Sequence, residues 1–298
     1  MAEHVSVLLN EAIGWLDPGP GKVIVDGTLG GGGHAAAILE KVTPGGRLIG
    51  LDKDPAAVRE AARRFGGRDA VVLQKDFADI RDVLLSLGLE AVDGVLLDLG
   101  VSSLQLEDAG RGLSFLREGP LDMRLDPASA LTAEEIVNQF PAEKIRQILW
   151  TLGEERMARR IADRIVEARR ARVIRTTREL EAIVFHAAPR AYRHGRIHPA
   201  TRTFQALRIA VNGELESLGR FLKEAPDFLK PGGRLAVISF HSLEDRLVKN
   251  RLREWEKERM GTVLTKKPVV PAEAEERANP RSRSAKLRAF QRREEGGR

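Results

Sequence analysis

Short apolar runs and helical patterns alternate along the first hundred residues of the chain. The apolar runs cover residues 23–25, 47–51, 70–73 and 92–97, and the helical patterns cover residues 34–42, 55–65 and 79–87. Nearly continuous apolar runs are typical of parallel strands that are buried on both faces. Their alternation with helices predicts an α/β fold with a doubly wound parallel sheet.

From about residue 110 to residue 228, helical patterns replace this alternation. They cover residues 132–140, 142–152, 155–171, 177–188 and 203–229. Two helix starts carry the spacing of a capping box, Thr132 with Glu135 and Thr176 with Glu179. The pattern predicts that an all-helical domain is inserted into the sheet domain.

The α/β pattern resumes at Pro231-Gly-Gly with an apolar run at 234–240. The last strands are expected at 262–265 or 269–270, and at 286–290. We therefore expect residues 1–109 to form the first part of the sheet domain and residues 110–212 to form a helical insertion that recognises the substrate. Residues 213–298 would complete the sheet domain and carry a basic C-terminal tail.

The composition narrows the class of protein. The chain has 298 residues, of which 42% are hydrophobic and 31% charged, and no run of 18 apolar residues predicts a membrane span. The N-terminus lacks the pattern of a signal peptide, and the absence of cysteine suits a reducing cytoplasm. His194 and His198 are four residues apart, but no Glu follows the first, so we expect no zinc-protease site and no metal.

Positive charge is concentrated in two segments. Residues 141–210 carry a local charge of +9 and residues 277–298 a local charge of +6, on a chain whose net charge is +6. The rest of the chain is therefore acidic. A single basic helix is often only a solvated face, but two basic segments on an otherwise acidic chain favour a nucleic-acid partner.

Residues 26–34 read Asp-Gly-Thr-Leu-Gly-Gly-Gly-Gly-His, directly between the first apolar run and the first helical pattern. A glycine-rich turn at this position lets the backbone approach a cofactor closely. Nicotinamide and S-adenosylmethionine enzymes both use such loops. Asp26 at the start of the loop favours S-adenosylmethionine, because a carboxylate neutralises an ammonium group and opposes a pyrophosphate.

Acidic residues also follow the next predicted strands. Asp52 ends the second and could accept the hydroxyl groups of a ribose, Asp76-Phe77 follows the third and could meet an adenine, and Asp98 ends the fourth. Each Asp alone could be an ordinary helix cap. Because ligands of open α/β sheets lie at the carboxyl ends of the strands, the series predicts one cofactor cleft.

Long motifs along nearly the whole chain resemble the bacterial small-subunit rRNA N4-cytosine methyltransferase family. They lie at residues 26–34, 50–55, 98–103, 111–115, 120–126, 153–155, 198–208, 231–246 and 279–284. The chain departs from the family pattern at Ser6, Leu104, Glu107 and Leu113, none of which removes a charged or glycine site. The resemblance implies a Rossmann-like class I methyltransferase fold that uses S-adenosylmethionine.

The resemblance also assigns roles to particular residues. Gly32, Gly33 and His34 would line the methionine end of the cofactor, Asp52 would hold its ribose, Phe77 would flank its adenine, and Asp98 and Gln105 would complete the cleft. The strand ends pointed to Asp52, Phe77 and Asp98 without the resemblance. They did not point to Gln105, nor to His34, which alone suggests only the first turn of a helix.

The implied reaction is methyl transfer to the exocyclic N4 of a cytidine in 16S rRNA, in the decoding region of the small subunit. A proton must then leave the nitrogen, and Asp98 and Ser102 are candidate acceptors. His241 could face the base, although a helix cap formed with Ser242 and Glu244 explains it equally well. The basic insertion and Arg281, Arg283, Lys286 and Arg288 would bind RNA phosphates.

Three other functions stay open on the sequence. They are a nicotinamide-dependent reductase, a methyltransferase acting on DNA or protein, and a non-catalytic rRNA-binding assembly factor. The sequence also leaves open whether the chain acts as a monomer or a homodimer.

Overall fold

The chain folds as two units, one of which interrupts the other. In the computed structural model, which describes residues 6–193, 195 and 197–294, the first unit comprises Met1–Gly100 and Leu215–Arg298, and the second comprises Val101–Glu214. The sequence placed these boundaries after residues 109 and 212. The first boundary falls earlier because the chain leaves the sheet directly after the fourth strand.

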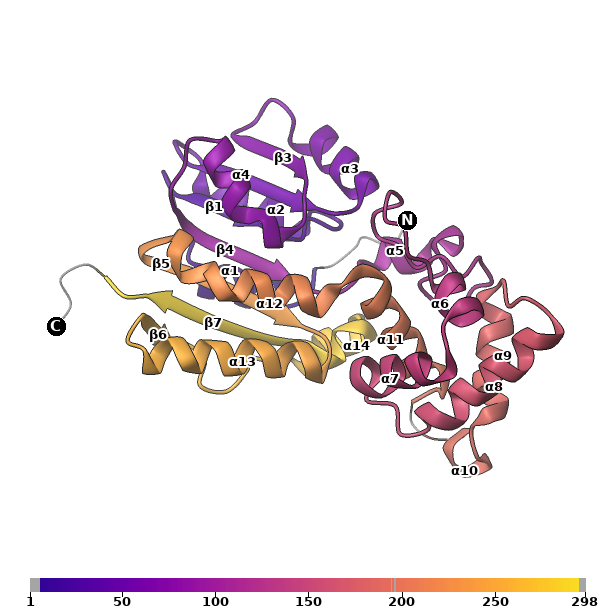
Figure 1. Cartoon of the computed structure of the whole chain (residues 1–298). Helices are drawn as coiled ribbons and strands as arrows, with labels where there is room; N and C mark the ends of the chain where they lie inside the picture. The colour runs from indigo at the N-terminus through magenta and orange to yellow at the C-terminus, as the bar shows by residue number, and fades with distance from the viewer. Residues whose placement is uncertain (1–5, 194, 196, 295–298) are drawn as a thin grey trace. The chain divides into compact units, whose positions relative to one another are not determined.

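The first unit is built on a seven-stranded sheet in the order β3-β2-β1-β4-β5-β7-β6 (Figure 1). The strands are β1 (Val23–Asp26), β2 (Arg47–Asp52), β3 (Ala70–Gln74), β4 (Val92–Asp98), β5 (Leu229–Ser239), β6 (Gly261–Val263) and β7 (Lys286–Arg292). Strands β1 to β5 are parallel, and β7 runs antiparallel to both β5 and β6. The doubly wound sheet predicted from the apolar runs is confirmed, and so is the Rossmann-like fold that the resemblance implies.

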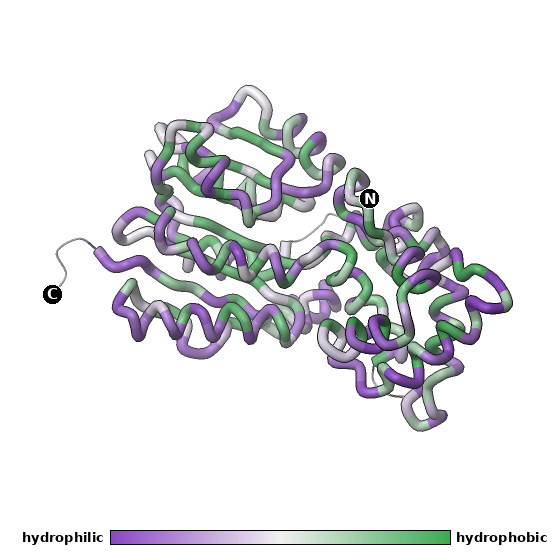
Figure 2. The backbone as a smooth tube through the Cα atoms, in the orientation of Figure 1, coloured by the Kyte–Doolittle hydropathy of each residue, from purple (hydrophilic) through white to green (hydrophobic). Residues whose placement is uncertain are grey.

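Helices cover both faces of this sheet. One face packs against α1 (Leu9–Leu16), α2 (Gly33–Val42) and α3 (Pro55–Phe65), and the other packs against α4 (Ile80–Ser86), α12 (Glu214–Glu224) and α13 (Ser242–Lys257). Neighbouring strand residues alternate between the two cores, as Ile24 and Val25 do, and both are fully buried. Figure 2 shows the central strands as hydrophobic and α13 as largely hydrophilic along its outer side.

The strand order changes direction between β1 and β4. From β1 the chain proceeds outward through β2 and β3, and from β4 it proceeds outward through β5 on the other side. Ligands of open α/β sheets bind at such a switch point, beyond the carboxyl ends of the strands. Asp26 and Asp98 end the two strands that flank it.

The second unit is helical, apart from one isolated bridge between Pro120 and Thr176. Its helices are α5 (Ser103–Glu107), α6 (Ala133–Gln139), α7 (Ala142–Gly153), α8 (Ala158–Ala171), α9 (Thr177–Ala187), α10 (Arg190–Arg193) and α11 (Ala200–Asn212). Thr132 caps α6, and Thr176 forms a complete capping box with Glu179 at the start of α9. The predicted single helix over 203–229 is wrong: Gly213, at φ 60°, ends α11 and separates it from α12.

The C-terminal part of the sheet differs in detail from the prediction. The predicted strand at 286–290 is β7, and of the two alternatives for the other strand 262–265 is closer to β6, while Val269 forms only an isolated bridge to Leu287. Helices α1, α5, α10, α13 and α14 (Glu273–Ala278) were not predicted. Throughout the described residues, no helix is both long and apolar enough to cross a membrane.

Candidate functional site

The loop after β1 is built around close backbone approaches. A Cβ on Gly27 would lie 2.4 Å from Leu97 Cδ2, so a larger residue there would displace the buried Leu97 side chain. Gly30 and Gly32 have φ of 46° and 73°, in the left-handed region that favours glycine. The loop therefore wraps tightly over the end of β4 before α2 begins at Gly33.

Asp52 fastens this loop to the second strand. Its Oδ2 accepts a hydrogen bond from the Gly30 amide at 2.9 Å, and its Oδ1 accepts one from the Asp54 amide at 2.8 Å. Asp54 in turn caps α3 by accepting from the Ala56 amide. Asp52, the residue predicted to bind the ribose, is thus half-buried against the glycine loop at the carboxyl end of β2.

The third strand end is already occupied by protein contacts. Asp76 accepts hydrogen bonds from Ser217 and from the Ala78 amide, and its Oδ2 lies 2.8 Å from Lys53 Nζ. Both carboxylate oxygens of Asp76 therefore hold the local fold, and a hydrogen bond from Asp76 to an adenine stays a prediction. Phe77 is half-buried beside it and packs edge-on against Phe221, with ring centroids 5.8 Å apart.

His34 and Asp98 lie together at the switch point. His34 is buried, its Nε2 lies 3.1 Å from the Val7 carbonyl oxygen, and its Nδ1 lies 3.5 Å from Asp98 Oδ2. A carbonyl oxygen can only accept, so Nε2 must carry a hydrogen. In the neutral imidazole Nδ1 then carries no hydrogen, and this nitrogen faces the Asp98 carboxyl group.

The carboxyl groups at the ends of β1 and β4 have raised pKa values. Burial raises the pKa of Asp26 to about 7, although a hydrogen bond from the Thr28 amide acts against this, and the negative charge of Asp52 adds to it. Burial also raises the pKa of Asp98 well above its ordinary value, and the charges of Asp26 and Glu244 raise it further. Several carboxyl groups thus share one poorly solvated region.

Two oxygens in this region have no hydrogen-bond partner. Among the described residues, no donor reaches Asp26 Oδ2 or Asp98 Oδ1, and both atoms are buried. Buried acceptors without partners are rare and costly, so their presence indicates a place for a ligand that donates hydrogen bonds or carries positive charge. A cationic group at the switch point would satisfy both.

His241 follows β5 and caps α13. Its Nδ1 accepts from the Glu244 amide at 3.3 Å, and Glu244 Oε2 accepts from the His241 amide, which completes a capping box. His241 Nε2 lies 3.2 Å from Glu244 Oε1 without the geometry of a hydrogen bond. The helix cap that the sequence left as an alternative is present, and a catalytic role stays a hypothesis.

Ser102 and Gln105 belong to the second unit. Ser102 caps α5 by accepting from the Gln105 amide at 3.3 Å, and Gln105 Oε1 accepts from the Ser102 amide at 2.8 Å. The Gln105 side chain is nearly buried, at 8% exposed. No strand end points to Gln105, and its one signal in the sequence is the Ser-x-x-Gln spacing of a capping box.

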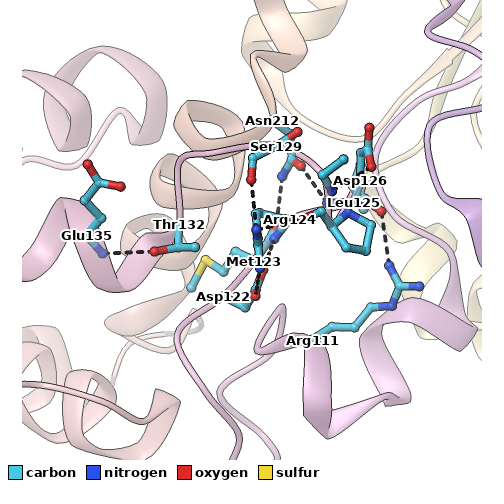
Figure 3. Close-up of polar contacts among 12 residues, drawn as sticks. Arg111, Asp122, Met123, Arg124, Leu125, Asp126, Ser129, Thr132, Glu135 and Asn212 are labelled. Carbon is cyan, nitrogen blue, oxygen red and sulfur yellow. Dashed lines mark hydrogen bonds and ion pairs between the residues drawn. The ribbon is translucent and has the colours of Figure 1, made fainter.

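The motif at 120–126 forms a polar scaffold within the second unit (Figure 3). Arg124 forms a two-pronged ion pair with Asp122 and donates to the carbonyl oxygens of Pro127 and Ser129 at 2.8 Å. Asn212, at the end of α11, donates to the Met123 carbonyl and accepts from the Leu125 amide. The motif therefore holds an irregular segment in place, which explains its charged residues without a ligand.

A basic groove of about 340 Å³ runs along α8 in the same unit. Its charged lining is Arg156, Arg159, Arg160, Arg164, Asp163 and Glu167. Arg164 is paired with Glu167 at 2.7 Å, whereas no described residue forms an ion pair with the other three arginines. Arg156 before α8 and Arg159 and Arg160 in its first turn are all exposed, which is the charge pattern expected for phosphate contacts.

The two histidines weighed for a metal lie in this unit as well. His194 lies outside the described residues. His198 accepts from the Ala200 amide through Nδ1, faces Glu181 through Nε2 at 3.3 Å, and stacks on Phe115 with ring centroids 4.7 Å apart. These contacts account for both ring nitrogens of His198.

The predicted basic tail is in part a core strand. Arg288 is 6% exposed, within β7, and its Nε donates to Asp245 Oδ1 at 2.7 Å, while Lys286 Nζ lies 3.4 Å from Asp245 Oδ2. Arg281 and Arg283 are exposed in a short 3-10 helix, Pro280–Ser284. The strand predicted at 286–290 lies within this basic segment, and its Ala289 and Phe290 are fully buried.

Comparison with known proteins identifies close relatives. The model of the MraW methylase family matches residues 1–293. Proteins named ribosomal RNA small subunit methyltransferase H are 52% identical in Pelobacter propionicus (97% of this chain, 98% of that protein) and 48% in Desulfosudis oleivorans (96% and 97%). In Synechococcus elongatus the identity is 50% (97% and 94%). The solved structure of an rRNA methylase from Streptococcus thermophilus matches 96% of this chain and 94% of that one, at 10% identity and a TM-score of 0.44.

Proposed function

Since this chain belongs to the MraW methylase family, we propose that it transfers a methyl group from S-adenosylmethionine to N4 of a cytidine in 16S rRNA. The relatives carry the name of a small-subunit rRNA methyltransferase, and they match this chain over nearly its full length. From the family resemblance we place the target in the decoding region, and we place the activity in the cytoplasm, where small subunits are assembled.

The single observation that best supports the cofactor is the pair of buried, unpartnered oxygens, Asp26 Oδ2 and Asp98 Oδ1. S-adenosylmethionine carries an ammonium and a sulfonium, so these carboxylates fit its charge. A dinucleotide would instead bring a pyrophosphate toward them. We infer that the cofactor is held by Gly32, Gly33, His34, Asp52, Phe77, Asp98 and Gln105.

When bound, the cofactor supplies an electrophilic methyl group. The lone pair of the cytosine N4 is delocalised into the ring, so the protein contributes by positioning the base and by removing a proton. Asp98 is the proposed acceptor, because its raised pKa makes the ionised carboxylate a stronger base than an ordinary aspartate. His34 would position it: Val7 fixes the imidazole so that Nδ1 faces the Asp98 carboxylate. Ser102 and His241 are weaker candidates, since each already caps a helix.

The proposal is tested by incubating the protein and methyl-labelled S-adenosylmethionine with small ribosomal subunits, free 16S rRNA and DNA. Nucleoside mass spectrometry is expected to find labelled N4-methylcytidine in at least one of the two rRNA samples and none in the DNA. Labelled DNA, or rRNA without N4-methylcytidine, would refute the substrate that we propose. Thermal shift with S-adenosylhomocysteine and with NAD separates the methyltransferase from a reductase.

The α8 groove gives an expected result for RNA binding. Arg159→Gln/Arg160→Gln should weaken binding of a 16S rRNA fragment about tenfold near 0.1 M salt and lower the slope of log K against log salt by about 1 to 2, because phosphate contacts release counterions. The matched control is Arg63→Gln/Arg68→Gln, which removes the same charge from exposed positions of the first unit. Fluorescence anisotropy across salt concentrations provides the measurement, and equal loss in both variants would contradict a role for the groove.

A further inference from the structure

A second basic pocket, of about 250 Å³, lies in the first unit, against the sheet edge farthest from β3. It is formed by α13, by the chain around β6 and by β7, and its charged lining consists of Lys249, Arg253, Glu256, Lys266 and Arg288. The β1–β4 switch point lies elsewhere in the strand order. The pocket is therefore separate from the cofactor residues, and nothing in the proposed reaction uses it.

Arg288 gives the pocket a fixed, buried cation. Its side chain is 7% exposed, and Asp245 holds it through Nε at 2.7 Å. Asp245 itself has a pKa below its ordinary value because of Arg288 and Lys286, although its burial opposes this. Among the described residues, neither Nη of Arg288 has a hydrogen-bond partner. A guanidinium that is anchored through Nε, and whose Nη groups bond no described residue, can donate those groups to an anion in the pocket.

The other cations of the lining come from two further segments. Lys249 and Arg253 are one turn apart on α13, and Lys266 follows β6. No ion pair among the described residues involves any of these three. Glu256 is the one acid of the lining, and its Oε1 accepts from the Val263 amide at 2.9 Å. Like charges brought together around a concave surface repel each other unless a counter-charge lies between them.

We propose that this pocket binds a phosphate group. A phosphate group carries negative charge and several acceptor oxygens. Its oxygens can accept from the planar guanidinium groups of Arg288 and Arg253, and its charge is matched by Lys249 and Lys266. In the reaction proposed above, the phosphate is one of the 16S rRNA backbone, so this assignment rests on the proposed function. A free phosphate or a nucleotide offers the same chemistry, and the experiment separates the two sources.

The test uses the full chain and two matched variants. Lys249→Gln/Arg253→Gln removes two charges from the pocket and leaves Arg288 and Asp245 in place. Lys257→Gln/Lys267→Gln removes two charges from exposed positions nearby that do not line it. For each protein, inorganic phosphate binding is followed by NMR at constant ionic strength, and binding of a 16S rRNA fragment by anisotropy. Affinity for S-adenosylhomocysteine reports that the first unit is intact.

We expect wild type and the control to bind phosphate with a dissociation constant on the order of millimolar, and the pocket variant to bind about tenfold more weakly, as expected when two charge-assisted contacts are lost. If its RNA affinity also falls about tenfold and its salt slope falls by about 1 to 2, the phosphate is that of the RNA. Loss of phosphate binding with RNA affinity equal to the control supports a free phosphate as the ligand. Phosphate binding that is absent from wild type, or equal in both variants, overturns the proposal, whether or not the protein methylates rRNA.

Discussion

Replacing Asp26 with asparagine is expected to stabilise the ligand-free protein above pH 7 and to weaken its binding of the cofactor. The pKa of Asp26 is about 7 in the folded protein and near 3.8 once burial is lost. Between these pH values the folded protein holds a proton that the unfolded chain releases. The free energy of unfolding is therefore not reduced by Asp26 below pH 4, and it falls as the pH rises toward 7. The ionised carboxylate then costs the fold on the order of 4 kcal/mol.

Asparagine removes that cost and keeps an oxygen for the Thr28 amide, but it places a buried N–H₂ where Oδ2 lay. We expect a net gain on the order of 2 kcal/mol in the free energy of unfolding at pH 8, after about 1–3 kcal/mol for the unsatisfied amide, and little gain at pH 5. Urea denaturation at both pH values measures it, and Asp69→Asn is the exposed control. A gain that is equal at pH 5 and pH 8 would contradict a raised pKa.

The same substitution should act on the cofactor in the opposite direction. If Asp26 meets the ammonium of the cofactor, affinity for S-adenosylhomocysteine should increase from pH 6 to pH 8 in the wild type, because the carboxyl must ionise first. In Asp26→Asn it should be about 10- to 100-fold weaker at pH 8 and independent of pH, the loss expected for one hydrogen bond between charged groups. Isothermal titration calorimetry at pH 6 and pH 8 measures these affinities. If Asp26→Asn keeps the pH dependence of the affinity, another group causes that dependence.

The second large effect is expected at Asp98. Asp98→Asn preserves the shape of the side chain but cannot accept the proton that leaves N4, so the rate of methyl transfer should fall about 10²- to 10³-fold. The limb of the pH–rate profile on which the wild-type rate rises with pH should disappear, because the carboxylate must be ionised to act as a base. Affinity for S-adenosylhomocysteine should also fall, since Asp98 belongs to the proposed cofactor site, but by a smaller factor than the rate.

Single-turnover rates between pH 6 and pH 9 test this, with Asp69→Asn as the matched control. If Asp98→Asn turns over at the wild-type rate, Asp98 does not take part in the reaction. A loss confined to cofactor affinity would assign it to binding alone. His34→Gln provides a second arm: the role of His34 in positioning Asp98 predicts a shifted pH–rate profile rather than a loss of cofactor affinity alone.

The apolar pattern of the sequence predicts much of the sheet because strands buried on both faces leave an unambiguous signal. The runs at 23–25, 47–51, 70–73 and 92–97 each lie within a strand of the structure. Helix α13 was missed because only Val248, Leu252 and Trp255 and two acids are buried along its length, so charged residues dominate its sequence. Gly213 shows the converse, since one residue at positive φ splits a continuous helical pattern.

Part of the candidate site could also be predicted from the sequence. Asp52 and Asp98 follow from strand ends, because the carboxyl ends of parallel strands meet at one edge. The sequence could not predict that His34 contacts Asp98 and Val7. The contact with Val7 joins α2 to the N-terminal segment, which has no strand pattern in the sequence. The sequence also did not reveal that Asp76, at the end of the third strand, bonds Ser217 and pairs with Lys53 within the fold.

The interrupted sheet has a consequence for how the chain is made. Strands β4 and β5 pair along their lengths, from Val92↔Leu229 to Asp98↔Ile238, although the whole helical unit separates them in sequence. A ribosome therefore delivers β1 to β4 well before any residue of β5, and during that interval the apolar β4 has an open edge of the kind that pairs with other chains. Closing so long a loop costs entropy that grows with its length. Folding of the helical unit before β5 emerges would shorten the effective loop, so the insertion also determines how long a nascent chain is exposed to aggregation.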